Sequence, residues 1–262
     1  MRISILQTDI VWENKQENLR RLREKLETLR GTTEIVVLPE TFSTGFSMDT
    51  ASLAEPTTGE TIATLRQWSE EYRLALAGSY IACETASEGR KPSYYNRAFF
   101  LTPEGNTYYY DKRHLFTYGG EHKEYTGGDR RVIAEYKGWR ILLQVCYDLR
   151  FPVWSRNRDD YDMILYVASW PTPRVEAWNA LLKARAIENV CYVAGVNRVG
   201  DDPNCNYCGG TVLLDFLGKP LADAGTGGQP ATLSAEADKI SLTTFREKFP
   251  ALQDADPFTL NI

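Results

Sequence analysis

The stretch LLQVCYDLRFP, residues 142–152, places a cysteine at the point where an apolar run stops. Mostly apolar residues lead up to Cys146, and a Tyr-Asp-Leu-Arg cluster follows at once. The run predicts a buried strand, so Cys146 is either a small core residue or a nucleophile held where the chain turns. The run alone is compatible with both interpretations.

Two other reactive side chains end apolar runs in the same way. Glu40 closes EIVVLPE, and Lys112 follows TYYYD. Ligand sites in α/β sheets gather outside the carboxyl ends of strands, so three such ends can bring a carboxylate, an ammonium and a thiol together. We therefore expect Glu40, Lys112 and Cys146 to share one site.

The chemistry of these three groups is complementary. A thiol becomes a thiolate at neutral pH only with help from a nearby base or cation. Glu40 suits the base, whereas Lys112 and the backbone N–H of Tyr147 suit a developing oxyanion. The two histidines of the chain, His114 and His122, leave a Cys-His pair open as an alternative.

Helical and extended patterns alternate along the chain. Apolar residues recur at helical spacing in segments 14–31, 59–73 and 174–189. Short apolar runs between and after them predict strands, and TPEGN and DFLGKP predict hairpin turns. The pattern predicts a layered α/β (α+β) fold with helices on outer faces. The runs are more numerous than one open sheet usually holds, so we expect two sheets.

Composition excludes several classes of protein. A net charge of −5 argues against nucleic acid as a partner, because that role needs a basic face. No apolar run approaches the roughly 20 residues of a membrane span. The N-terminal MRISILQTDIVWEN does not have the form of a signal peptide, and five cysteines cannot all pair within one chain. These features predict a cytoplasmic protein, and the lack of a linker predicts one domain over residues 1–262.

At these residues the sequence resembles the carbon–nitrogen hydrolase (nitrilase) superfamily over nearly its whole length. Four ordered blocks carry the resemblance: VVLPETFSTGF, YDKRHLF, QVCYDLRFPVWSRN, and WNALLKARAIEN with GVNRVG. The resemblance implies one carbon–nitrogen hydrolase domain with an α-β-β-α sandwich, no metal or organic cofactor, and a homodimer or higher homo-oligomer. It places the catalytic triad of the family on Glu40, Lys112 and Cys146. It also implies an auxiliary glutamate, for which Glu121 is the best match and Glu124 remains open.

Within the superfamily, the form CYDLRFP is most similar to the ω-amidase branch. That branch acts on ω-amides of small dicarboxylates such as α-ketoglutaramate and 2-oxosuccinamate. The resemblance places a substrate-carboxylate anchor on Arg150, for which a structural ion pair with Asp148 or another acid is the alternative. In the segment ASWPTPR, which is shorter than the form typical of several ω-amidases, Trp170 is the expected aromatic wall and Thr172 a hydrogen-bonding group.

Other functions remain open from the sequence. Another carbon–nitrogen hydrolase, acting on a carbamoyl amine or a nitrile, would share the triad. Cys205 and Cys208 form a single C-x-x-C, for which a metal or redox module is an alternative. One such pair is half of a usual zinc set, so free loop thiols are the favoured interpretation. Cys191 and Cys83 are interpreted as core residues. A catalytically silent binding protein on the same fold is a further alternative.

Overall fold

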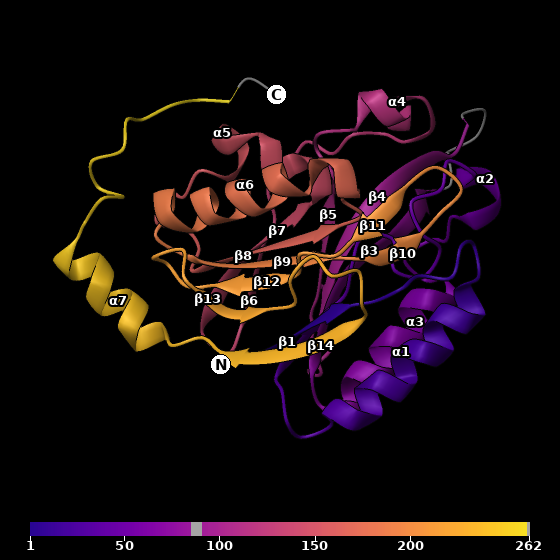
Figure 1. Ribbon diagram of the computed structural model, residues 1–262, viewed down its shortest axis with the longest axis horizontal. Coiled ribbons are helices and arrows are strands. Elements are labelled where there is room, and N and C mark those ends of the chain that lie inside the picture. The colour runs from indigo at the N-terminus through magenta and orange to yellow at the C-terminus, as the bar shows by residue number, and fades with distance from the viewer. Residues whose placement is uncertain (85–90, 261–262) are drawn as a thin grey trace.

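The computed structural model describes residues 1–84 and 91–260 of the chain. Two six-stranded sheets lie face to face, with helices on their outer sides (Figure 1). One outer side carries α1 (Lys15–Leu29) and α3 (Glu60–Tyr72), and the other carries α5 (Pro152–Ser155) and α6 (Val175–Glu188). The predicted two-sheet α-β-β-α sandwich is therefore confirmed.

The first sheet has the strand order β14-β1-β2-β3-β4-β5. Strands β1, β2 and β3 are parallel, whereas β14, β4 and β5 join by antiparallel pairing. The segment TPEGN turns the chain between β4 and β5, as predicted. The strands are β1 (Arg2–Gln7), β2 (Ile35–Val37), β3 (Ala75–Glu84), β4 (Ser93–Leu101), β5 (Thr107–Asp111) and β14 (Ala231–Glu236).

The second sheet has the strand order β13-β12-β9-β8-β7-β6. Strands β7, β8 and β9 are parallel and form its centre. DFLGKP connects β12 to β13, so this predicted hairpin is also confirmed. The strands are β6 (Ile133–Tyr136), β7 (Trp139–Val145), β8 (Met163–Ala168), β9 (Tyr192–Asn197), β12 (Val212–Leu214) and β13 (Pro220–Asp223).

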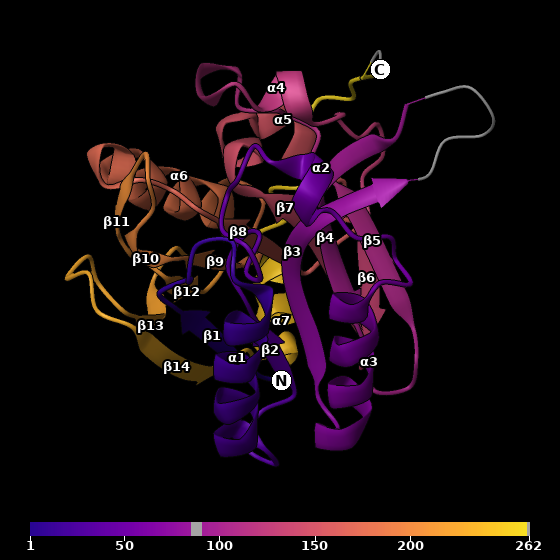
Figure 2. The same cartoon turned by 90° about the vertical axis from the view of Figure 1, so that its right-hand side faces the viewer.

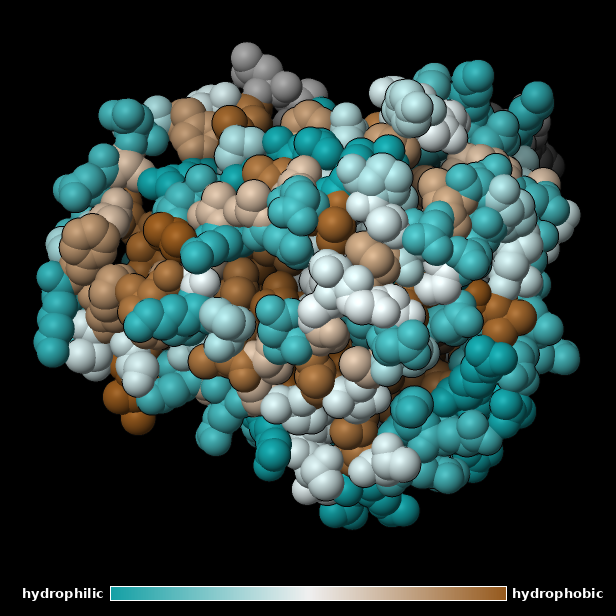
Figure 3. Space-filling model, in the orientation of Figure 1, coloured by the Kyte–Doolittle hydropathy of each residue, from teal (hydrophilic) through white to brown (hydrophobic). Residues whose placement is uncertain are grey.

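The core has three layers of apolar contacts. Side chains of both sheets fill the space between them, including Ile5 of the first sheet and Leu165 of the second. On the outside, α1 buries Leu22, Leu26 and Leu29 against the first sheet. Their spacing puts them on one helix face, while charged residues cover the opposite face. Figure 3 shows the resulting hydrophilic surface over the side that carries α1 and α3.

Three short helices follow the strand ends that the sequence singled out. α2 (Thr50–Leu53) comes after the β2 end, α4 (Glu121–Glu124) after the β5 end, and α5 after the β7 end. Figure 2 shows α2, α4 and α5 gathered at one end of the molecule. The carboxyl ends of the three strands therefore meet there.

Two features were not predicted. The segment containing CNYC is a two-stranded hairpin, β10 (Val199–Asp201) and β11 (Asn206–Cys208), and not a plain loop. Near the C-terminus, α7 (Lys239–Lys248) lies at the edge of the molecule (Figure 1), where Phe245 packs against Phe216 with ring centroids 5.0 Å apart. Of the helices that the structure describes, none is both long and apolar enough to cross a membrane.

Candidate active site

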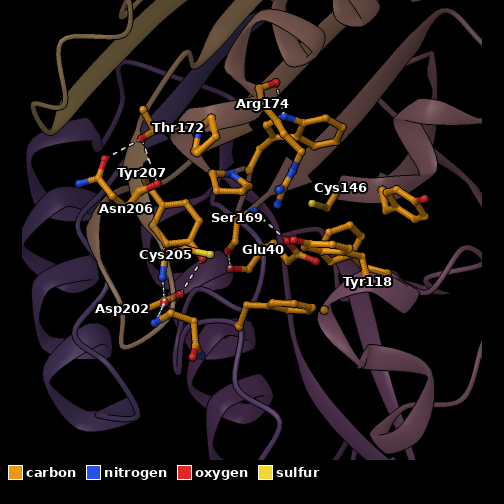
Figure 4. Close-up of a pocket in the computed structure, with 18 of the residues that line it drawn as sticks. Glu40, Tyr118, Cys146, Ser169, Thr172, Arg174, Asp202, Cys205, Asn206 and Tyr207 are labelled. Atoms are coloured by element: carbon orange, nitrogen blue, oxygen red, sulfur yellow. Dashed lines mark hydrogen bonds between the residues drawn. The ribbon is translucent and has the colours of Figure 1, made fainter.

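The three strand-end residues line one cavity of about 790 Å³. Glu40 lies three residues beyond β2, whereas Lys112 and Cys146 directly follow β5 and β7. The two sheets therefore both contribute to the site. Figure 4 shows Glu40 and Cys146 directed into the same space, with residues of the β10–β11 hairpin on its other side. The predicted convergence of carboxylate, ammonium and thiol is present.

Cys146 occupies a strained turn. Its φ of +45° lies in the left-handed region, which costs a non-glycine residue about 1–3 kcal/mol unless the surroundings hold it. The chain passes there from β7 into a single 3₁₀ turn, η2 (Cys146–Arg150). The buried Asp148 carboxylate accepts a hydrogen bond from the backbone N–H of Val145 at 3.0 Å and so closes the turn. The turn presents the Cys146 thiol to the cavity.

Lys112 is buried between two carboxylates. Its Nζ lies 3.0 Å from Oε1 of Glu40 and 3.0 Å from Glu121. Glu121 is itself buried and also accepts the Phe116 N–H at 2.6 Å, whereas Glu124 is exposed. Glu121 is therefore the second carboxylate beside the lysine.

Glu40 is fixed by groups that the sequence did not single out. Its Oε1 accepts a hydrogen bond from Asn96 Nδ2 at 2.7 Å, and its Oε2 accepts the Ser169 N–H at 2.7 Å. Asn96 belongs to β4 and Ser169 follows β8, so both sheets hold this carboxylate. Asn96 is held in turn by the Ser79 hydroxyl, which donates to its Oδ1 at 3.0 Å.

Burial and neighbouring charge determine the protonation of the site. Burial, with the Glu40 carboxylate beside it, raises the pKa of the Cys146 thiol well above its ordinary value, and the Lys112 ammonium opposes this only in part. Burial disfavours the Lys112 ammonium, but the Glu121 and Glu40 carboxylates outweigh it and raise the lysine pKa. Burial also raises the pKa of Glu121, against the effect of Lys112. The resting site thus holds a neutral thiol and a charged lysine, with Glu40 placed to accept the thiol proton.

The raised pKa of Cys146 predicts the pH dependence of its alkylation. For an acid, a raised pKa favours the neutral form, so the reactive thiolate remains scarce through neutral pH and increases as pH rises. We expect the rate of iodoacetamide alkylation at Cys146, followed by mass spectrometry of the peptide, to keep rising beyond pH 9. A plateau reached below pH 7 would show a thiolate already formed in the free protein and contradict this protonation state.

Two guanidinium groups line the cavity. The guanidinium carbon of Arg150 lies 5.0 Å from the centroid of the Trp170 ring, and that of Arg174 lies 5.2 Å from the centroid of the Phe116 ring. Both arginines line the cavity, and within residues 1–84 and 91–260 neither forms an ion pair. The alternative pairing of Arg150 with Asp148 is not found. Arg174 was missed by the sequence reasoning, although it follows Trp170 in the quoted segment ASWPTPR.

The remaining predicted substrate-binding residues also line the cavity. Tyr147 is half-buried beside Cys146, and its ring packs against Phe116 with centroids 5.1 Å apart. Trp170 is largely buried, and its Nε1 donates to the Arg174 carbonyl at 2.7 Å. The Thr172 hydroxyl donates to Asn206, with Oδ1 at 2.7 Å. Thr172 therefore fixes the β10–β11 hairpin.

That hairpin also lines the cavity. Its contribution, which the sequence did not predict, comprises Asp202, Asn204, Cys205, Asn206 and Tyr207. Cys205 and Cys208 are both free and half-buried, and no three potential metal ligands cluster anywhere in the described part of the chain. Cys191 is buried as predicted, whereas Cys83, at the end of β3, is only half-buried.

Comparison with known proteins matches this architecture to one family. The family model described as carbon-nitrogen hydrolase matches residues 2–247. The chain belongs to the carbon–nitrogen hydrolase family. The resemblance inferred from the sequence blocks is thereby confirmed.

Two relatives of this hydrolase are named as amidases of ω-amide substrates. It is 48% identical to the omega-amidase YafV of Yersinia enterocolitica, over 99% of this chain and 98% of that protein. It is 31% identical to the 2-oxoglutaramate amidase of Bacillus subtilis, over 96% of each chain. The crystal structure of XC1258 from Xanthomonas campestris, a CN-hydrolase superfamily protein with an arsenic adduct in its active site, superposes with a TM-score of 0.91. That protein is 42% identical, and the alignment covers 100% of this chain and 99% of the other.

Proposed function

We propose that this carbon–nitrogen hydrolase cleaves the ω-amide of small dicarboxylate monoamides, such as α-ketoglutaramate and 2-oxosuccinamate, to the acid and ammonia. The similarity to an omega-amidase and to a 2-oxoglutaramate amidase supports this reaction. The structural observation that supports it best is the pair of guanidinium groups in the cavity that holds Cys146. A substrate with an amide at one end and a carboxylate at the other fits both features of this cavity.

In the proposed first half-reaction, Glu40 removes the Cys146 proton and the thiolate attacks the amide carbon. The Lys112 ammonium and the Tyr147 N–H stabilise the tetrahedral oxyanion, and such donors are typically worth about 3–4 kcal/mol each. Protonated Glu40 then gives its proton to the leaving ammonia, which leaves a thioester on Cys146. The hydrogen bonds from Asn96 and Ser169 hold the Glu40 carboxylate while it exchanges this proton.

In the second half-reaction, Glu40 takes a proton from water and the resulting hydroxide attacks the thioester. The same oxyanion donors act again, and the thiol is regenerated when Glu40 returns the proton. Glu121 positions Lys112 in both steps, because its carboxylate holds the ammonium at 3.0 Å. Every proton in this cycle is carried by Glu40, so the reaction requires no further acid or base from the chain.

At the other end of the substrate, Arg150 and Arg174 bind the carboxylate. A guanidinium offers a planar fork of N–H donors that matches a carboxylate. Stacking on Trp170 and Phe116 orients the two forks. Since the described chain supplies no carboxylate partner for either arginine, their charges remain available to a substrate.

Removal of either arginine is predicted to change substrate preference more than chemistry. Arg150→Ala and Arg174→Ala should each lower kcat/KM for α-ketoglutaramate by about 10²-fold, because truncating one partner of a close charge pair costs about 2–5 kcal/mol. For a neutral short-chain amide, both variants should remain within about threefold of wild type. Ammonia release measured on the two substrates gives the ratio.

Arg130→Ala is the matched control, because Arg130 is 89% exposed and lies outside the cavity, so it removes the same charge elsewhere. Equal losses on the charged and the neutral amide in Arg150→Ala would eliminate its anchoring role. Faster turnover of a carbamoyl amine or a small nitrile than of α-ketoglutaramate would assign the protein to another carbon–nitrogen hydrolase reaction. A lack of turnover on all of these substrates would support a silent binding protein.

We further propose that residues 1–262 act as one domain in a cytoplasmic homodimer. The match of the family model to residues 2–247 supports the single domain. The five unpaired cysteines suit a reducing compartment. Val153 on α5 and Ile187 on α6 are about half exposed, at 51% and 50%, and suit an apolar contact between subunits. Sedimentation equilibrium of the purified protein tests the dimer.

A further inference from the structure

The two catalytic halves of the site come from different sheets. Glu40 and Lys112 follow strands of the first sheet, whereas Cys146 follows β7 of the second. A displacement of about 1 Å between reacting groups can cost on the order of 10²-fold in rate. The carboxyl ends of the two sheets must therefore be held in their relative position more precisely than apolar packing alone ensures.

A buried carboxylate outside the cavity meets this need. Asp148 is 0% exposed and lies two residues after Cys146 on the same turn. Its Oδ2 accepts the Tyr110 hydroxyl at 2.7 Å, and its Oδ1 accepts the His114 backbone N–H at 3.0 Å. Tyr110 lies two residues before Lys112 and His114 two residues after it. Asp148 thus ties the Cys146 turn to both flanks of Lys112.

The contact with His114 is also oriented. Its Nδ1 lies 2.8 Å from Asp148 Oδ1, and because an ionised carboxylate only accepts hydrogen bonds, this nitrogen donates. The imidazole stacks on the Phe151 ring, with centroids 3.8 Å apart and planes 6° from parallel. Phe151 follows the Cys146 turn directly, so the stacked ring adds a second link between the two strand ends.

Tyr110 extends the network to the next element. Its hydroxyl accepts hydrogen bonds from Trp154 Nε1 at 2.9 Å and from the Arg113 N–H at 3.1 Å, while it donates to Asp148. Trp154 belongs to α5, which begins directly after Phe151. Each polar group of this network that faces Asp148 forms a hydrogen bond with it. None of Asp148, Tyr110 and His114 lines the cavity.

We propose that Asp148, Tyr110 and His114 form an inter-sheet strut that sets the position of Lys112 relative to the strained Cys146 turn. They are positioning residues, which act on the reaction through Lys112 and Cys146 and do not touch the substrate. A separate hydrogen bond, from the Ser169 N–H to Glu40, also joins the two sheets at the site. This proposal rests on the amide-hydrolysing chemistry of the triad and is independent of which amide is the substrate.

The test compares Asp148→Asn with the same substitution at a buried aspartate far from the site. Asp162, 2% exposed, is held by Arg140 at 3.0 Å and Lys239 at 3.0 Å. Asp162 precedes β8, whereas Ser169 of the site follows β8, so Asp162 lies at the end of this strand that is opposite to the site. Asp148→Asn should lower kcat at least about 30-fold and leave KM within about threefold. Asp162→Asn should lower Tm comparably while kcat stays within about threefold.

The substrate panel separates this role from carboxylate binding. Loss of the strut should lower kcat by the same factor on α-ketoglutaramate and on a neutral amide, whereas failure of the arginine anchor changes their ratio. A kcat for Asp148→Asn within threefold of wild type would overturn the proposal. An equal loss of kcat in Asp162→Asn at the same loss of Tm would also overturn it, because general destabilisation would then explain both.

A second pair of variants keeps the proposal testable if Asp148→Asn does not fold. His114 is partly exposed, at 23%, and tolerates substitution more readily. His114→Leu removes the side-chain donor and should lower kcat about tenfold. His114→Asn retains an N–H donor and should recover most of that loss. Equal kcat values for the two variants would refute the strut.

Discussion

Replacement of Cys146 by alanine is expected to lower kcat at least about a thousandfold, because the thioester cannot form without the sulfur. The fold should persist, since the side chain is small and lies at the cavity surface, with Tm close to wild type. Ammonia release from α-ketoglutaramate and thermal unfolding measured on the same preparation check both parts. Cys146→Ser should be nearly as inactive, because its hydroxyl is a weaker acid than the thiol.

Cys208→Ser is the control for this experiment. Cys208 is also half-buried and free, but it pairs with Val199 in the hairpin and does not line the cavity. Its substitution should leave kcat within about threefold. Ammonia release by Cys146→Ala at a rate near wild type would exclude the covalent mechanism.

Replacement of Lys112 by methionine is expected to lower kcat by about 10²–10³-fold, the usual effect of removing one oxyanion donor. It should also destabilise the fold by about 3–5 kcal/mol, because Glu40 and Glu121 would remain as buried carboxylates without their cation. Urea unfolding at pH 7 measures the loss of stability.

The double variant Lys112→Met with Glu121→Gln separates the two effects. It removes one charge of each sign, so stability should recover in part while kcat stays low. Recovery of kcat together with stability would show that Lys112 serves only the fold and not the oxyanion.

The strand-end residues could be predicted because the end of an apolar run indicates where a buried strand ends. EIVVLPE, TYYYD and LLQVC each end this way, and parallel strand direction brings their ends together. The choice between Glu121 and Glu124 required structure, since it depends on which end of α4 faces Lys112. The role of Cys146 depended on a turn with positive φ, which a short motif does not specify.

Other residues could not be found because their partners are distant in the chain. Asn96 and Ser169 both contact Glu40, from 56 and 129 positions away in the chain. Neither lies in a charged or nucleophilic motif. Arg150 is close to Asp148 in sequence, but Tyr110 and His114 already satisfy that carboxylate and leave the arginine to the cavity. The C-terminal helix α7 was missed because TTFREKF combines β-branched and aromatic residues of modest helix propensity.

The central claim is that Cys146 forms a thioester with an ω-amide substrate. Enzyme mixed with α-ketoglutaramate, quenched in acid during turnover and digested, should give a peptide containing Cys146 whose mass is increased by that of the substrate less ammonia. The same peptide from Cys146→Ala should carry no adduct. Steady ammonia release without any adduct on the Cys146 peptide, or with an adduct on another residue, would contradict this account.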